Sequence, residues 1–264
     1  MHPSRRQVRG TVRIAIMLGS MLEALVRFGP IYLSSGGRVS GARRAIWVHD
    51  SFARLARRLS LVPTVSPAAS AEGAGLLVSN HLSYLDIMVY AAVRPLRFVA
   101  KFEVRRWPLV GILASLGGTI FIERERSLQV GQVAQQIEQS LREGVPVLLF
   151  PEGTSSDGSS VLPFRPPLFD PAIRAGACVT AAAIRYHADD AAEEEVTYWG
   201  DMVFLPHAFR TLCLRGLAAQ VTFGCSRRFD NRKTAAQVSW HQVQALREAG
   251  AEPETPAALA GAMS

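Results

Sequence analysis

Cysteine is scarce in this sequence, and that limits the cross-links and metal sites it can form. The 264 residues include three cysteines, Cys178, Cys213 and Cys225, and no two of them form a C-x-x-C pair. An odd and widely spaced set argues against a disulfide framework and against a zinc site. It is compatible with a reducing compartment, in which all three are most simply core residues.

Several sequence motifs that would assign a function are also absent. There is no G-x-S-x-G elbow of the kind that presents a hydrolase serine, and no G-x-x-x-x-G-K-[ST] phosphate loop. The chain has no internal repeats and no nucleic-acid reader motif. His187 lies near Asp189 and Asp190, but three acids follow at 193–195, so we expect a solvated loop there and no metal. A serine hydrolase and a P-loop enzyme are therefore disfavoured.

Lysine and acidic residues are nearly missing from the N-terminal segment. Residues 1–60 hold 11 arginines, no lysine and two acids, Glu23 and Asp50, which gives a charge of +9. The rest of the chain holds 18 of the 29 basic groups and 20 of the 22 acidic groups, so its charge is −2. A basic and apolar N-terminal segment predicts contact with an anionic surface, either a membrane or a nucleic acid.

Residues 11–33 are largely apolar but do not form an uninterrupted hydrophobic run. Arg13, Glu23 and Arg27 lie inside the stretch, and each charge at the bilayer centre costs about 2.5–3.5 kcal/mol on insertion scales. Pro30 is expected to end or kink a helix here. No A-x-A-like cleavage site follows closely, so a signal peptide is disfavoured. An interfacial or half-inserted helix fits this pattern better than a full membrane span.

A second amphipathic helix is predicted over residues 42–60. Trp47 and other apolar residues alternate there with arginines, as membrane-surface docking requires. The alternative is a solvated basic face whose apolar side packs on the protein's own core. We therefore divide the chain into membrane-docking helices at 1–62, a linker at 63–72, a catalytic body at 73–250 and a disordered tail at 251–264.

The body alternates between strand and helix patterns. This alternation predicts an α/β fold with a mostly parallel sheet flanked by helices. The expected strands are 76–79, 97–100, 118–124, 145–150 and 177–185, with further strands at 193–198 and 218–223. The expected helices are 84–93, 108–116, 128–142, a short one starting at 173, and 233–248. A Gly/Ser/Pro-rich loop at 151–169 is long enough to indicate a functional segment.

The turn after the first body strand carries the clearest chemical signal. Asn80 and His81 follow the strand, and Ser83 precedes Asp86 by three residues, as at a helix start. Asp86 is close enough to reach back to an imidazole nitrogen of His81, which would make a general-base pair. The same residues also fit a purely structural role, in which Asp86 caps the helix and His81 bonds to the turn.

Three further predicted strands end in titratable groups. Lys101, Arg124 and Glu152 follow the strands at 97–100, 118–124 and 145–150. Sites in parallel sheets lie at the carboxyl ends of the strands, so these groups are expected near His81. Each also has a purely structural explanation, because Lys101 and Arg124 can be solvated strand ends and Glu152 can be a turn residue.

Taken together, these motifs resemble those of the lysophospholipid acyltransferases of the bacterial 1-acylglycerol-3-phosphate acyltransferase type. That family carries N-H-x-x-x-x-D, which is N-H-L-S-Y-L-D at 80–86. Its second block, a Gly and an Ile-Phe pair ending in Arg, is similar to G-T-I-F-I-E-R at 118–124. Its third block, F-P-E-G-T-R-S, is similar to F-P-E-G-T-S-S at 150–156. The resemblance covers roughly residues 70–190.

The resemblance implies the glycerolipid acyltransferase fold and an O-acyl transfer. His81 would take the proton of the acceptor's hydroxyl, which attacks the thioester of acyl-CoA or acyl-ACP, and Asp86 would orient and stabilise the imidazole. No covalent intermediate, cofactor or metal is implied. The expected partners are membrane lipids and the acyl donor, without nucleic acid, at the cytoplasmic face of the inner membrane through a monotopic or single N-terminal anchor. The implied acceptor-binding residues are Lys101, Arg124, Glu152, Gly153, Thr154 and Ser155.

The sequence departs from the family at two places. Ser155 replaces the Arg of the third block, which removes a cation from the implied phosphate site, and the stretch 179–184 lacks the proline usual in a fourth block. The expected acceptor is 1-acylglycerol-3-phosphate, giving phosphatidic acid; the alternative is lyso-ornithine lipid or another lysolipid, whose branch residues 198–202 resemble. Arg165 of the same loop is a candidate to replace the lost charge. A catalytically inactive membrane-binding relative is the non-enzyme alternative, although it would have no need of an intact His81, Asp86 and Glu152.

Overall fold

A computed structural model describes residues 4–61, 63–65, 75–123 and 127–250. Three predictions therefore lie outside the described residues. They concern the disordered tail at 251–264, most of the linker at 63–72, and the position of Arg124.

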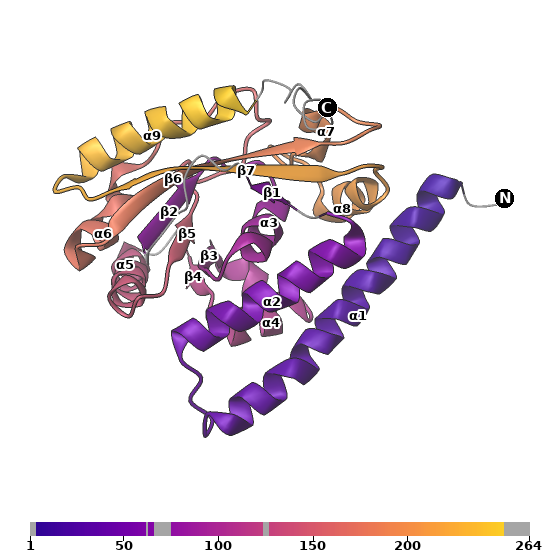
Figure 1. Ribbon diagram of the computed structural model, residues 1–264, viewed down its shortest axis with the longest axis horizontal. Coiled ribbons are helices and arrows are strands. Elements are labelled where there is room, and N and C mark those ends of the chain that lie inside the picture. Colours follow the sequence, from indigo (N-terminus) through magenta and orange to yellow (C-terminus); the bar gives the residue numbers. More distant parts are fainter. Residues whose placement is uncertain (1–3, 62, 66–74, 124–126, 251–264) are drawn as a thin grey trace, which may run out of the picture.

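Within these ranges the body is built on one seven-stranded sheet with the order β1-β7-β6-β2-β5-β3-β4 (Figure 1). Every neighbouring pair is parallel except β6 and β7, which are antiparallel. The mostly parallel α/β fold is thus confirmed. The strands are β1 (Thr64–Val65), β2 (Gly75–Ser79), β3 (Arg97–Lys101), β4 (Ile120–Ile122), β5 (Val147–Leu149), β6 (Cys178–His187) and β7 (Ala218–Arg227).

Helices cover both faces of the sheet because its central strands are apolar on both sides. Successive residues of a strand point to opposite faces: Leu77 joins one apolar cluster, and Leu76 and Val78 join the other. Burying a side chain of this size stabilises the fold by about 1.5–3 kcal/mol. The body helices are α3 (Leu85–Val93), α4 (Val110–Leu116), α5 (Ser127–Arg142), α6 (Asp170–Ala175), α7 (Glu193–Val196), α8 (Phe204–Leu212) and α9 (Arg232–Ala249), with 3₁₀ turns η1 (Phe102–Arg106) and η2 (Pro166–Phe169).

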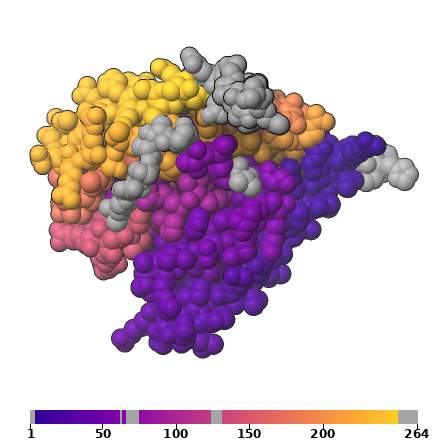
Figure 2. Space-filling model, viewed as in Figure 1, coloured from indigo at the N-terminus to yellow at the C-terminus, as the bar shows by residue number. Residues whose placement is uncertain are grey.

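The N-terminal segment folds as two helices, α1 (Arg5–Ser34) and α2 (Gly41–Leu59). Together they protrude to one side of the sheet and its covering helices (Figure 2). The apolar side of α2 packs on the body, since Val48, Leu55 and Leu59 are buried in the same apolar cluster as Leu77 of β2. Trp47 is only 3% exposed, and its indole donates a hydrogen bond to the Ala24 carbonyl of α1. The second interpretation from sequence, a basic helix packed on the protein's own core, therefore holds for the apolar face of α2.

In the long helix α1, Arg13 and Glu23 face the protein, while a stripe of apolar residues faces outward. Arg13 donates to the carbonyls of Leu212 and Leu214, and Glu23 forms ion pairs with arginines of α2. The outward stripe is apolar and exposed: Val8, Val12, Leu18, Leu22, Val26 and Leu33. By length and composition α1 suffices to cross a membrane, and only 11% of its apolar window is buried.

Of the two outcomes expected at Pro30, an end of the helix is excluded, because α1 runs on to Ser34; Gly29 before it has no Cβ to clash with the proline ring. Three other details of the sequence-based element assignment are wrong. Residues 193–196 form helix α7 rather than a strand, because three glutamates occupy a first helical turn, where the dipole favours acids. Helix α8 was not predicted. The linker contains strand β1, which pairs with β7.

Candidate active site

The site lies where β2 ends, as expected for a parallel sheet. β2 is bounded by β5 and β6, and β3 lies beyond β5. The carboxyl ends of β2, β5 and β3 therefore stand side by side, with neighbouring strands about 4.8 Å apart. His81, Glu152 and Lys101 follow these three strand ends, so the topology brings together three of the residues that the sequence singled out.

The structure contains the predicted hydrogen bond between His81 and Asp86. The imidazole Nδ1 lies 2.7 Å from Asp86 Oδ2, and the carboxyl is completely buried while the imidazole is partly exposed. With Nδ1 donating to the carboxylate, Nε2 is the nitrogen left to accept a proton. The ring is also stacked on Phe150, with centroids 4.1 Å apart and planes 13° apart. The imidazole is thus fixed from its edge and from one face.

Asp86 organises the whole turn as well as the histidine. Its Oδ2 accepts hydrogen bonds from the backbone amides of Leu82 (2.8 Å) and Ser83 (3.1 Å) in addition to the imidazole. The expectation that Ser83 caps the helix is wrong, because α3 begins at Leu85 without a side-chain cap and Ser83 Oγ is buried with no partner among the described residues. Asp86, from inside the first turn of α3, instead bonds to the amides of the turn that precedes the helix.

The second carboxylate oxygen is held by a residue that sequence reasoning missed. Tyr186 donates from its hydroxyl to Asp86 Oδ1 over 2.7 Å, and the tyrosine is fully buried on β6. Burial and the neighbouring carboxylate raise the pKa of Tyr186 well above its usual value, so it stays a donor. The sequence carries no local signal for this contact, since the two residues are 100 positions apart.

The loop after β5 is tied to the backbone of His81 at two points. The His81 amide donates to Glu152 Oε1 (3.0 Å), and the Ser156 amide donates to the His81 carbonyl (3.0 Å). The segment of F-P-E-G-T-S-S that carries Glu152 therefore lies directly against the histidine turn. Two motifs separated by some seventy residues form one site through these bonds.

Glu152 is nearly inaccessible, and its protonation state follows from that. Burial raises the pKa of Glu152 to about 8, and the amides of His81 and Leu162 offset this only in part. Its Oε2 is buried without a hydrogen bond of normal geometry to the described residues. The raised pKa favours the neutral carboxyl, which offers an O–H donor as well as an acceptor.

Two buried polar groups fix the walls of the site. Asn80 bonds to the amide and the carbonyl of Ile184, which joins the end of β2 to β6. Arg247 of α9 pairs with Glu193 (2.8 Å) and donates to the carbonyls of Ile184 and Gly158. This arginine therefore anchors the middle of the 151–169 loop at Gly158, a role that sequence reasoning missed.

The remaining predicted residues lie along the open side of the site. Thr154 is exposed and Ser155 is partly exposed, while Gly153 is buried with a positive φ of 78°. A Cβ built on Gly153 would lie 2.8 Å from the guanidinium of Arg165, so that exposed arginine crosses directly over the glycine. Lys101 is exposed at the end of β3.

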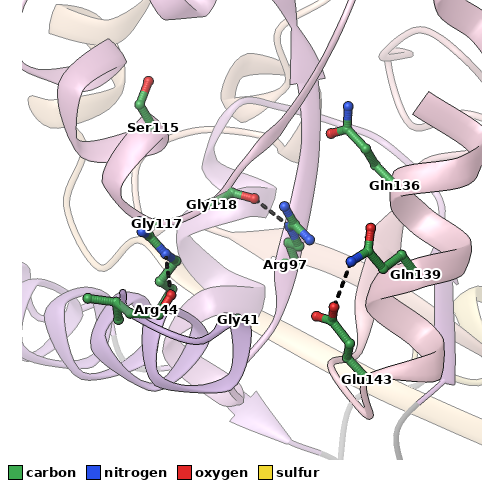
Figure 3. Close-up of a pocket in the computed structure, with 10 residues that line it drawn as sticks. Gly41, Arg44, Arg97, Ser115, Gly117, Gly118, Gln136, Gln139 and Glu143 are labelled. Atoms are coloured by element: carbon green, nitrogen blue, oxygen red, sulfur yellow. Dashed lines mark hydrogen bonds between the residues drawn. The ribbon is translucent and has the colours of Figure 1, made fainter. Parts of the chain in front are cut away.

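A cavity of about 430 Å³ lies at the amino ends of β3 and β4, whereas His81 follows the carboxyl end of β2. Its lining includes Arg97, which starts β3, Gly118, which precedes β4, and Glu143, which follows α5. Figure 3 shows Arg97 between Gly118 and the glutamines of α5, with its Nε donating to the Gly118 carbonyl. Arg44 similarly donates to the Leu116 carbonyl. These arginines hold the turn before β4, so the cavity is separate from the site.

No metal centre is formed by the described residues, since no three of their His, Cys, Asp or Glu side chains cluster in a way that could hold an ion. This arrangement places an oriented imidazole next to a buried carboxyl, and the backbone of the Glu152 loop comes close to the histidine.

Comparison with known proteins finds relatives that carry the names of two kinds of acyltransferase. A 1-acyl-sn-glycerol-3-phosphate acyltransferase of Neisseria gonorrhoeae is 33% identical over 60% of this chain and 62% of its own length. A lyso-ornithine lipid O-acyltransferase of Pseudomonas aeruginosa is 39% identical over 52% of this chain and 53% of its own. One of Brucella abortus is 33% identical over 90% of this chain and 94% of its own. The match thus spans less than two thirds of the Neisseria and Pseudomonas proteins.

A solved structure shares the fold. The 1-acyl-sn-glycerophosphate acyltransferase PlsC of Thermotoga maritima superposes with a TM-score of 0.67 at 17% identity, over 95% of this chain and all of that one. The protein-family model described as Acyltransferase matches residues 52–185, which include the histidine turn and the Glu152 loop. On this match and the near full-length Brucella relative, the chain belongs to the acyltransferase family.

Proposed function

We propose that this protein is an O-acyltransferase that moves a fatty acyl group from a thioester donor to the free hydroxyl of a lysolipid. The observation that carries the proposal is the His81–Asp86 pair at 2.7 Å, with the Glu152 loop bonded to the backbone of the same histidine. The lysolipid names of the relatives support the substrate class.

In the proposed reaction His81 is the general base. Its Nε2 takes the proton of the acceptor hydroxyl while the hydroxyl oxygen attacks the thioester carbonyl carbon. A C–O bond forms and the C–S bond breaks. The proton then passes from the imidazolium to the leaving thiolate, which returns the histidine to its neutral state. No group of the enzyme becomes acylated.

Asp86 contributes by stabilising the imidazolium that forms in the transition state. A carboxylate that already accepts three N–H bonds and one O–H bond does not need to reorganise when the charge appears. Tyr186 and the turn amides hold it in place, and Phe150 keeps the imidazole from rotating out of line.

The acceptor headgroup is proposed to lie on Arg165, between the Glu152 loop and the end of β3. Gly153 permits the close approach of the Arg165 guanidinium because it has no side chain. Thr154, Ser155 and Lys101 border the same opening. Arg165 has the geometry to supply the cation that Ser155 does not, since a guanidinium suits an anionic headgroup.

Two acceptors are compatible with this opening. A 1-acylglycerol-3-phosphate is the first, with Arg165 and Lys101 as the cations for its phosphate. Lyso-ornithine lipid is the second, and two observations favour it: Ser155 stands where a further cation would be expected for a phosphate, and the Brucella relative of that name matches along almost its whole length. An ornithine headgroup carries a single carboxylate, which requires less positive charge.

The proposed location is the cytoplasmic face of the inner membrane, where acyl-CoA or acyl-ACP is the donor. Helix α1 is bonded to the body near its start, through Arg13, and to α2 near its middle, through Ala24 and Glu23. A helix that crossed the bilayer would have to give up these contacts. When α1 lies in the membrane interface with its apolar stripe facing the lipid, it keeps these contacts and places the site beside its lipid substrate.

An acyl-transfer assay tests the proposal. Purified protein is given labelled acyl-CoA or acyl-ACP with lysophosphatidic acid and lyso-ornithine lipid in parallel, and His81→Ala serves as the control. Transfer to one of the acceptors that is lost in His81→Ala is expected. If wild type and His81→Ala give equal signals with both acceptors, the enzyme reading is wrong.

A further inference from the structure

A second exposed apolar surface lies outside α1, around helix α8. We call it the α8 surface and define it by Trp107, Trp199, Val203, Leu205 and Phe209. All five are exposed, Val203 at 68% and Leu205 at 74%. Large apolar side chains gathered in this way on a globular protein mark an interaction site, because water solvates them poorly.

The α8 surface is connected directly to the catalytic turn. The Tyr198 amide donates to the Leu82 carbonyl over 2.8 Å, and Tyr84 Oη lies 3.2 Å from His207 Nδ1 of α8. The ring of Phe204 packs between Tyr84 (4.9 Å) and Trp107 (4.6 Å). Residues of the N-H-x-x-x-x-D motif therefore form the inner wall of the structure whose outer side is the apolar surface.

The α8 surface also adjoins α1. Gly10 lies so close to Phe209 that a Cβ there would be 3.1 Å from its ring. Arg9 and Arg13 of α1 donate to the carbonyls that end α8 and follow it. The N-terminal half of α1 thus runs beside α8 (Figure 1), with the face that carries Gly10 and Arg13 turned toward α8.

Arginines lie at two borders of the α8 surface. Arg105 and Arg106 precede Trp107, and Arg210 follows Phe209; all three are exposed. The exposed acids nearby are Glu103, Asp201 and the pair Glu194 and Glu195, which precede Trp199. Tryptophan with arginine at the border of an apolar patch is the composition that favours the headgroup region of a bilayer.

We propose that the α8 surface inserts into the lipid bilayer beside α1 and forms the entrance through which the lysolipid reaches His81. The occupant is a bilayer rather than a protein because the surface adjoins α1, which carries its own exposed apolar stripe, and because two tryptophans and three arginines lie at its border. The role as an entrance rests on the proposed function, whereas the insertion itself does not. Membrane contact at both elements places the acceptor hydroxyl within reach of the turn without extracting the lipid into water.

Vesicle partition of the full chain tests the insertion. The variant Val203→Glu/Leu205→Glu changes two highly exposed side chains, so the fold is retained, as circular dichroism and the melting temperature will show. The matched control is Val65→Glu, which is 45% exposed on β1. On vesicles of phosphatidylglycerol and phosphatidylcholine we expect the double variant to partition about tenfold more weakly, since two apolar residues leave the interface. The control should stay within about twofold.

Quenching and kinetics give independent readouts. Brominated lipids should quench the tryptophan fluorescence, and Trp107→Phe/Trp199→Phe should remove most of that quenching. With the acceptor embedded in vesicles the Val203→Glu/Leu205→Glu rate should fall in parallel with partition, while a short-chain acceptor below its micelle concentration is acylated at the wild-type rate.

Two outcomes overturn the proposal. One is wild-type partition by the double variant without tryptophan quenching. The other is a loss of self-association in the double variant with vesicle binding intact, which would make the surface a protein interface. If wild type acylates no acceptor, the proposed function fails, yet partition and quenching still decide the insertion.

Discussion

Replacing Asp86 by Asn removes one charge from the site while leaving its shape almost unchanged. The Asn oxygen is expected to take the place of Oδ2, because three N–H donors, from His81, Leu82 and Ser83, point at that position. The amide nitrogen then faces Tyr186, whose hydroxyl can rotate from donor to acceptor. The turn and the histidine tautomer are retained, and only the stabilisation of an imidazolium is lost.

The size of the loss follows from the distance between the charges. Two unit charges about 4 Å apart attract by about 4 kcal/mol at an effective dielectric constant near 20. A transition state that loses this attraction forms about 10³-fold more slowly, which lies within the range for acid–base groups of roughly 10²–10⁴. We expect kcat of Asp86→Asn to fall by about this factor, with KM for the acceptor nearly unchanged. The free energy of unfolding should drop by about 1–3 kcal/mol, as the bonds lose their charged acceptor.

The assay is the steady-state rate of acyl transfer at saturating donor and acceptor, combined with urea unfolding of the same preparations. Tyr186→Phe is the control, since it removes one hydrogen bond from Oδ1 and leaves the charge in place. Its rate should fall by no more than about tenfold, because the carboxylate keeps its charge and its three N–H donors. A folded Asp86→Asn protein with kcat within about threefold of wild type would refute the general-base assignment of His81.

Three further predictions address the loop after β5. The pKa of Glu152 is raised to about 8, so the folded protein keeps the proton of this carboxyl at pH values where the unfolded chain, with a pKa of about 4.5, has lost it. The free energy of unfolding should therefore fall by a few kcal/mol between pH 4.5 and 8 and then level off. Glu152→Gln should flatten this part of the pH profile of urea unfolding, and an unchanged slope would contradict the assignment. Gly153→Ala should lower the unfolding free energy by about 1–2 kcal/mol because its φ is positive, and it should raise KM for the acceptor by pushing Arg165 aside; an unaltered KM would show that Arg165 does not bind the headgroup. With a phosphate acceptor, Arg165→Ala should raise KM, and Ser155→Arg/Arg165→Ala should restore part of the loss, so a double variant worse than the single one would count against charge replacement.

Much of the fold could be predicted because local patterns determine it. Short apolar runs such as 75–79 can only be buried strands, and their alternation with helices predicts a parallel sheet. The places where prediction failed depend on partners. Helix α8 is defined by its packing against α1 and Tyr84, and the antiparallel pairing of β7 depends on where the chain returns to β6.

The same distinction holds for the site. His81 and Asp86 are five positions apart, so the sequence alone placed them in one turn and predicted their hydrogen bond. That Glu152 belongs beside them followed from a resemblance and from the rule about strand ends. The geometry that joins them, a backbone amide donating to a buried carboxyl, is visible only in the folded chain.

The sequence by itself determined the fold class, the histidine–carboxylate turn and the basic, apolar N-terminus, because each is written in residues close to one another. The tertiary structure decided which groups act on that turn from a distance. Tyr186 and Arg247 reach it or its loop from β6 and α9, and burial favours the neutral form of Glu152. Burial and contact across a sheet depend on the positions of all the strands at once, which no local pattern specifies.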